Sequence, residues 1–200
     1  MTESRAALLT AAAAEFAQFG LHGARIKGVV ARAGVNERMI YHHFGSKEGL
    51  YGAVMDDQRL MLAGAWIPIL EKAAHEPPAT GMRTALASFY DLITTRRETV
   101  ALFMHEWLSD WHGRLIPTAD QLPAPLRNLY ERGQEEGTFR PDVPFETAYG
   151  VALGSLMAMA AFGPRFAAIA LPELQLDREE LRDQVIDQLI DGMSGPPTRP

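Results

Sequence analysis

The sequence VNERMIYHHFGSKEGL, residues 35–50, predicts a short helix, a tight turn and the start of a longer helix. Asn36 is a favourable N-cap residue, and Ile40 and Phe44 are four residues apart, so they lie on the same face of a helix. Gly45 then favours a turn, and Ser46 can cap the helix that follows. We therefore expect Ile40 and Phe44 to point inward and the other face of this short helix to meet solvent.

The residues before this stretch predict two more helices. Leu8, Leu9, Ala12, Phe16 and Phe19 recur at three- and four-residue steps, and Gly20 is a suitable stop. Residues 25–33 form a shorter segment with Ile26, Val29 and Val30 on one face, and Gly34 fits the left-handed conformation that ends a helix. Three helices with a tight turn between the last two are typical of a helix-turn-helix unit.

The exposed face of the short helix carries side chains of the types that contact DNA. With Ile40 and Phe44 inward, Glu37, Arg38, Tyr41 and His42 are left on or near the outside. A helix of this size fits the major groove, where Arg, Glu and amide side chains contact base edges. Tyr and His more often reach phosphates and fix the register of the protein on DNA.

Lys47 is unusual because it is a cation in the first turn of a helix, where it opposes the helix dipole. Together with the cap of Ser46 and the first backbone N–H groups, its ammonium predicts an anion site suited to a DNA phosphate. A solvated surface lysine with no such role is the alternative.

The net charge of −6 argues against a nucleic-acid partner, but the charge is unevenly distributed. Residues 22–47 hold five Lys or Arg and one Glu, a net of +4, whereas residues 51–200 hold thirteen basic and twenty-one acidic residues, a net of −8. This asymmetry indicates a small cationic head on an acidic body.

The remainder of the chain also predicts helices, at about 47–66, 80–96, 99–112, 121–136, 145–162 and 178–191, so the fold class is all-α. The first of these is expected to end before Pro68. The apolar stretch 151–162 is too short to span a bilayer and predicts a buried helix. The absence of cysteine excludes disulfides and thiolate metal sites, and without a signal-peptide pattern we expect a cytoplasmic protein with no membrane contact.

Residues 26–50, IKGVVARAGVNERMIYHHFGSKEGL, resemble the DNA-binding signature of the TetR family of bacterial transcriptional repressors. The matching positions keep fixed spacing across about a quarter of the chain, and RGQEEGTFRPDV from Arg132 resembles a weaker pattern of that family. The family's usual Thr or Ser cap of the first short helix is replaced here by Ala24-Arg25. Arg38 stands where a small residue is common, which makes a bidentate contact to guanine plausible.

The resemblance implies particular roles for residues of this chain. Residues matching Tyr41, His43 and Lys47 contact phosphates or hold helix ends, and those matching Asn36 to Met39 face the bases. The full set expected to bind DNA is Arg25, Lys27, Asn36, Glu37, Arg38, Met39, Tyr41, His42, His43 and Lys47.

The resemblance also implies a homodimer built from the last two long helices, here 149–162 and 181–190, with Gly150 and Gly154 allowing close approach. An ordinary intrachain core is the alternative for each residue. Aromatic and Met side chains further suggest a pocket for a largely hydrophobic effector, although such residues are also common in plain cores. The candidate ligand-binding residues are Phe89, Tyr90, Ile93, Phe103, Met104, Trp107, Trp111, Tyr149 and Met157.

The expected organisation is a helix-turn-helix domain at 1–46, a helical effector-binding and dimerisation domain at 47–194 and a disordered tail at 195–200. The expected function is a ligand-responsive repressor that binds a palindromic duplex operator; an activator or a protein-interaction module remains an alternative. An enzyme is not expected: HEWLSDWH has Ser109 where a two-His zinc motif needs its second His, and no phosphate loop or nucleophile elbow occurs. No cofactor, metal or catalytic residue is predicted.

Overall fold

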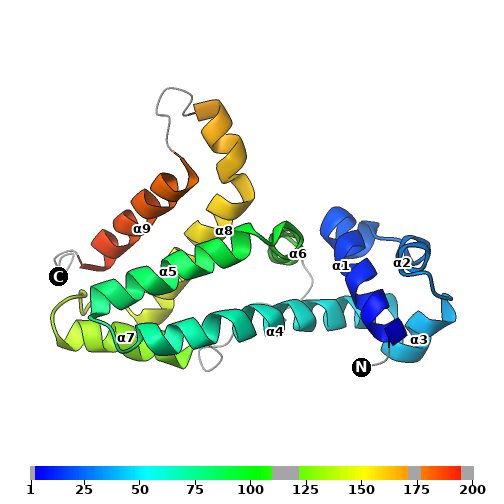
Figure 1. Cartoon of the computed structure of the whole chain (residues 1–200), viewed down its shortest axis with the longest axis horizontal. Helices are drawn as coiled ribbons and strands as arrows, with labels where there is room; N and C mark the ends of the chain where they lie inside the picture. Colours follow the sequence, from blue (N-terminus) through cyan, green and yellow to red (C-terminus); the bar gives the residue numbers. More distant parts are fainter. Residues whose placement is uncertain (1–2, 110–121, 171–176, 195–200) are drawn as a thin grey trace. The chain divides into compact units, whose positions relative to one another are not determined.

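The computed structural model describes residues 3–109, 122–170 and 177–194, without the side chains of 164–170 and 178. Helices are the only regular secondary structure in these ranges, and they confirm the predicted all-α class (Figure 1). In chain order they are α1 (Glu3–Gly23), α2 (Ile26–Ala33), α3 (Arg38–Phe44), α4 (Lys47–Ala73), α5 (Pro78–Thr94), α6 (Arg97–Trp107), α7 (Ala124–Glu135), α8 (Phe145–Ala170) and α9 (Arg178–Ser194).

The chain divides into two compact units. The first comprises residues 1–63 and 96–116, and the second comprises 64–95 and 117–200. The first unit thus holds α1 to α3, the first part of α4, and α6. The second holds the rest of α4 with α5, α7, α8 and α9.

The core of the first unit forms where α1 packs against α2 and α6. Leu8, Phe16 and Ile40 are fully buried, and the rings of Phe16 and Tyr51 meet edge to face at 5.0 Å between centroids. The buried hydroxyl of Tyr51 donates a hydrogen bond to Glu106 Oε2 at 2.9 Å. Burial and this carboxylate raise the pKa of Tyr51 well above its usual value, so the phenol stays neutral and remains a donor.

Glycines end α2 and α3 as the sequence predicts, whereas α1 runs past its expected stop at Gly20. Gly34 and Gly45 have φ values of 67° and 76°, the left-handed region that costs glycine little. The amide of Gly34 donates to Val30 O and that of Gly45 to Tyr41 O. Gly20, with φ 66°, interrupts α1, which continues as a further turn to Gly23.

α4 extends past its expected end near Trp66 to Ala73 and contains Pro68. The proline removes one backbone donor, yet its side chain is exposed, so the loss does not disturb the core. Trp66, Leu70 and Ala73 are buried on both sides of it at helical spacing. The indole N–H of Trp66 also donates to Ala85 O at 3.1 Å, and this packing outweighs the helix-breaking tendency of Pro68.

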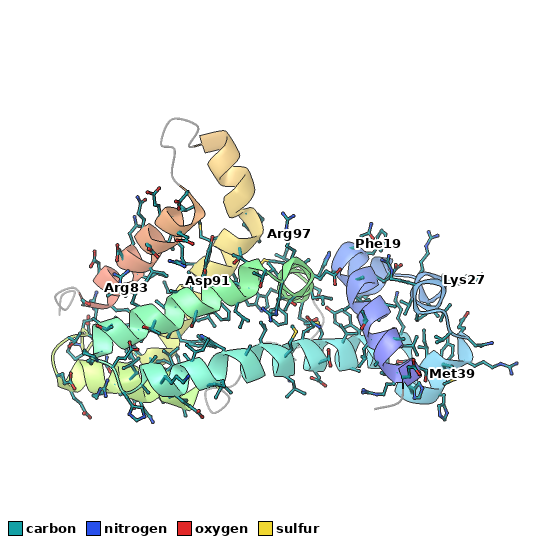
Figure 2. The ribbon with its side chains drawn as sticks, viewed as in Figure 1. Phe19, Lys27, Met39, Arg83, Asp91 and Arg97 are labelled. Atoms are coloured by element: carbon teal, nitrogen blue, oxygen red, sulfur yellow. The ribbon has the colours of Figure 1, made fainter. Side chains whose placement is uncertain are left out.

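α5 is the central helix of the second unit and packs against α7, α8 and α9. Two ion pairs join it to α9 (Figure 2): Arg83 with Asp187, and Asp91 with Arg182, whose Nη1 lies 2.9 Å from Asp91 Oδ2. Both pairs are partly exposed, so each adds little free energy, but together they fix the register of α9 on α5.

The RGQEEGTFRPDV segment forms the turn between α7 and α8. Gly137 adopts φ 75° after the end of α7, and the ring of Phe139 folds back over Gly133 so closely that a Cβ there would lie 2.2 Å from Phe139 Cδ2. Gln134 Nε2 donates to the carbonyls of Arg140 and Val143, at 2.8 and 3.0 Å. The segment therefore fixes the entry into α8.

The prediction that residues 151–162 form a buried helix is wrong within this chain. The apolar segment Phe145–Gly163 of α8 is long and hydrophobic enough to cross a bilayer by length and composition alone, and only 28% of it is buried. Val151 and Phe162 are 58% and 61% exposed. One side of α8 packs on its neighbours through Ala148, Ala152 and Leu156, and the other apolar side has no covering element among the described residues.

Candidate DNA-binding surface and effector pocket

The short helix α3 lies with one face inward, as the sequence predicts. Ile40 is fully buried. Asn36, the expected N-cap, lies one position too early: Glu37 occupies the N-cap without a capping side-chain bond, and Asn36 Oδ1 accepts the backbone N–H of Arg38 at 2.9 Å. Phe44, expected to point inward, is only half-buried, and the guanidinium of Arg5 lies over its ring, 5.3 Å from the centroid. Sequence reasoning missed this contact, since it joins α3 to the start of α1.

The opposite face of α3 is exposed. Glu37, Arg38 and His42 are exposed, and Tyr41 is 53% exposed. Met39 is half-buried at the edge of this face and is labelled in Figure 2. A short helix that presents acidic, basic and aromatic side chains together has the composition needed to contact base edges and phosphates in a major groove.

His43 differs from the other candidates because it anchors α3. It is half-buried, and its Nε2 forms a hydrogen bond of 3.2 Å with Ser4 Oγ of α1. Its ring also packs edge to face against Phe44, with centroids 5.9 Å apart. The family resemblance allowed His43 either to contact a phosphate or to hold a helix end, and this geometry suits the second role.

The start of α4 carries the predicted cap. Ser46 Oγ accepts the N–H of Gly49 at 3.0 Å. The backbone amide of Glu48 and the Ser46 hydroxyl lower the pKa of the Glu48 carboxyl, so Glu48 is negatively charged at this helix end. Lys47 Nζ lies 3.4 Å from His22 O, the carbonyl to which it donates. Ser46 and Glu48 thus already bind backbone N–H groups of the expected anion site. The Lys47 ammonium is the cation that this site offers to a phosphate.

α2 lies beside this surface and carries three exposed cations, Arg25, Lys27 and Arg32 (Figure 2 labels Lys27). Arg25 occupies the N-cap position with extended backbone, and its side chain makes no capping hydrogen bond. As expected from Ala24-Arg25, the residue at the N-cap of α2 gives the helix no side-chain cap. With Arg38 of α3, these three side chains make four exposed cations, against the single exposed acid Glu37, between residues 25 and 44.

Two family models match most of the chain. Residues 8–54 match the bacterial regulatory proteins of the tetR family, and residues 78–191, more than half of the chain, match the tetracyclin repressor-like C-terminal domain. The chain belongs to the TetR family. The matches confirm the resemblance seen in residues 26–50, and they identify the protein as a DNA-binding transcriptional regulator.

Individual relatives agree with this assignment. The transcriptional repressor NicS of Pseudomonas putida is 31% identical over 147 residues, which cover 71% of this chain and 68% of NicS. The repressor KstR2 of Rhodococcus jostii is 26% identical, with 72% of each chain covered. The solved structure of AibR, in complex with isovaleryl coenzyme A and operator DNA, has a TM-score of 0.67 at 18% identity, covering 95% of this chain and 97% of AibR. The last comparison supports the fold alone.

The candidate effector residues of this TetR-family protein come from both units. Phe89, Tyr90 and Ile93 of α5 are buried, and Phe89 packs against Trp66 at 4.7 Å between ring centroids. Phe103, Met104 and Trp107 belong to α6 in the other unit, where Trp107 is 46% exposed. Met157 of α8 is buried, and Trp111 lies outside the described residues.

Tyr149, another of the candidates, lines a recess. This small apolar recess of about 10 Å³, room for about one water molecule, lies within the second unit, between α5, α7, α8 and α9. Burial raises the pKa of Tyr149 to about 12. The other lining residues come from four helices, and those on one helix recur at helical spacing, but the sequence does not show that these helices meet: Met82, Leu86, Leu126, Tyr130, Phe145, Ala148, Ala152, Leu153 and Met193.

Two residues in the described part of HEWLSDWH, residues 105–109, have partners within the first unit. Glu106 accepts the hydroxyl of Tyr51, and the ring of His105 lies against Gly20. No group of three or more His, Asp or Glu side chains suited to a metal ion occurs in the described part of the chain. The TetR family and the named relatives are transcriptional regulators.

Proposed function

We propose that this protein is a ligand-responsive repressor that binds a palindromic operator as a homodimer and releases it when a small, largely hydrophobic effector binds. The observation that carries the proposal is the exposed face of α3 beside the cations of α2. The relatives NicS and KstR2 are named as repressors, which favours repression over activation for this chain. An activator of the same fold is the second candidate.

The contacts with DNA divide into two kinds. Asn36, Glu37, Arg38 and Met39 face base edges in the major groove, where Arg38 is suited to a bidentate contact with guanine. Arg25, Lys27, Tyr41, His42 and Lys47 contact phosphates and set the register. His43 supports α3 through its hydrogen bond with Ser4.

The exposed apolar side of α8 supports the homodimer. Val151 and Phe162 lie on it, and a Cβ at Gly150 or Gly154 would meet no atom within 4 Å. A second copy of the chain is the occupant that the function requires, because one small cationic head makes few phosphate contacts. In α9, Leu181, Val185 and Leu189 remain half-buried and would extend the same interface.

The effector is proposed to bind in the helical body, with the apolar recess beside Tyr149 as the starting point. At about 10 Å³ the recess has room for about one water molecule, so an effector can bind there only if the surrounding helices move apart. The effector shifts the protein away from its DNA-binding state only through its different affinity for the two states.

The salt dependence of DNA binding tests this function against a protein-interaction module. Affinity for duplex DNA should fall about 10³- to 10⁵-fold between 50 and 200 mM salt if the dimer makes roughly six to ten phosphate contacts. Protein that has been refolded from denaturant should be used, so that no co-purified effector blocks binding. A folded protein that has negligible affinity for duplex DNA at low salt would contradict the proposal that this protein binds an operator.

A further inference from the structure

α2 begins without a cap of its own, and another helix supplies the missing acceptor. The first N–H groups of a helix have no partner within it, and Arg25 offers no side-chain oxygen to them. Glu15, in the middle of α1, directs its carboxylate at this point: Oε1 accepts the backbone N–H of Arg25 at 3.2 Å. Glu15 is one of few charged side chains buried in the described part of the chain, at 6% exposure.

The position of the carboxylate is defined by two further contacts. Its Oε2 lies 3.9 Å from the Arg32 guanidinium on the next turns of α2. A Cβ added to Gly28 would lie 2.6 Å from Oε1 and 2.8 Å from Cδ of Glu15. The carboxylate therefore fills the space that a side chain at position 28 would occupy, and it adds a negative charge where the helix dipole favours one.

We propose that Glu15 is a positioning residue of the DNA-binding surface. Its bond is to the amide of Arg25 itself, so it fixes the backbone from which the exposed Arg25 side chain extends, and with it the first turn that carries Lys27. The carboxylate also takes the place that a phosphate would take at the N-terminus of α2. Because the carboxylate already occupies the backbone N–H of Arg25, a DNA phosphate is contacted by the side chains of Arg25 and Lys27 and not by this N–H. The inference rests on the phosphate contacts proposed above for Arg25 and Lys27.

Two substitutions of Glu15 separate geometry from charge. Glu15→Gln keeps an oxygen that can accept the Arg25 N–H, whereas Glu15→Leu keeps the size and removes the acceptor. The slope of log affinity against log salt should become less steep by about 0.9 for each phosphate that the protein no longer neutralises, hence by roughly 1 to 2 in the Leu variant. The Gln variant should keep the wild-type slope, and its affinity should be equal or higher because an acidic charge is gone.

Each variant is measured at a temperature where circular dichroism shows it fully helical, so that global unfolding does not enter. A purely structural Glu15 would lower the melting temperature of the Leu variant and leave the salt slope of the folded protein unchanged. That result would overturn the proposal, as would a Gln variant whose salt slope falls as much as that of the Leu variant.

Gly28 provides an independent test of the same contact. Gly28→Ala should displace the Glu15 carboxylate and reduce the salt slope, whereas in a Glu15→Ala background the same change should have little further effect. Gly64→Ala in α4, where a Cβ meets no atom within 4 Å, is the matched control. Additive effects of Glu15→Ala and Gly28→Ala would contradict a shared mechanism. If the wild type lacks salt-dependent binding, the proposed function fails; if the wild type binds and the variants keep its slope, this inference alone fails.

Discussion

At the scale of single residues, exposure separates two kinds of side chain on the DNA-binding surface. Arg38 and Tyr41 are exposed on α3, whereas His43 and Lys47 already have partners elsewhere in the first unit, Ser4 and the His22 carbonyl. The types of these residues could be predicted from the sequence. Their partners could not, because the helices that supply them lie 25 to 39 positions away in the chain.

Arg38→Ala should relax discrimination at one base pair by about 1–3 kcal/mol, because the variant cannot form bidentate hydrogen bonds to guanine. An Arg38→Ala protein with unchanged sequence preference would exclude a base-reading role for Arg38.

Lys47→Ala should weaken binding to all DNA sequences alike and reduce the slope of log affinity against log salt by about 1. Selection from a random duplex pool first identifies the preferred DNA sequence. Affinities for that sequence and for its single-base variants then measure both effects.

Tyr149 gives a prediction on pH dependence. Burial raises its pKa from 10.0 to about 12 in the folded protein, so between pH 10 and 12 the unfolded chain has released a proton that the folded chain keeps. The contribution of Tyr149 to stability is complete below pH 10 and is lost as pH rises through about 12, at about 1.4 kcal/mol per unit.

Denaturant unfolding of wild type and Tyr149→Phe across this pH range measures the contribution. The difference between the two proteins isolates Tyr149 from Tyr51 and Tyr130, whose pKa values are also raised. Equal slopes of stability against pH in the two proteins would show that Tyr149 is not buried in solution.

At the scale of helices and turns, glycine and cap residues predicted most boundaries of the first unit, since Gly34, Gly45 and Ser46 act locally. The extension of α4 through Pro68 was not predictable from local propensity, because packing of Trp66 and Leu70 decides it. The contact of Glu15 with α2 was missed for a similar reason. A glutamate among alanines in an amphipathic helix gives no sign that its partner is the next helix.

The close approach of Phe139 to Gly133 predicts that Gly133→Ala is strongly unfavourable. The added methyl would overlap the ring, and overpacking of this kind costs about 1–3 kcal/mol, seen as a lower melting temperature. Gly192→Ala in α9, where a Cβ meets no atom within 4 Å, is the control and should be neutral or slightly stabilising. Equal melting temperatures for the two variants would contradict the packing described for this turn.

At the scale of the whole molecule, the sequence predicted the all-α class and the helices of both family regions, but not the exposure of α8. Residues 151–162 are apolar throughout apart from Gly154 and Ser155, and composition cannot distinguish a helix buried in its own chain from one buried by a second copy. The structure leaves Val151 and Phe162 exposed. The proposed dimer accounts for that exposure.

Val151→Glu should raise the dimer dissociation constant at least about 100-fold, because a two-fold interface contains the substitution twice and each carboxylate must be desolvated. Light scattering on dilute protein measures the mass directly. Leu60→Glu on α4, where Leu60 is 74% exposed, is the matched control and should leave the mass unchanged. A Val151→Glu protein that remains dimeric would move the interface away from this side of α8.

Selection from a random duplex pool tests the central claim most directly. Protein refolded from denaturant is incubated with the pool at low salt, and the retained DNA is sequenced. We expect the retained DNA to contain a two-fold symmetric sequence. The centres of its two half-sites should be separated by about one helical turn, roughly 34 Å, or by a multiple of that distance. Retention without any enriched sequence, by protein that is folded and dimeric, would contradict an operator-reading regulator.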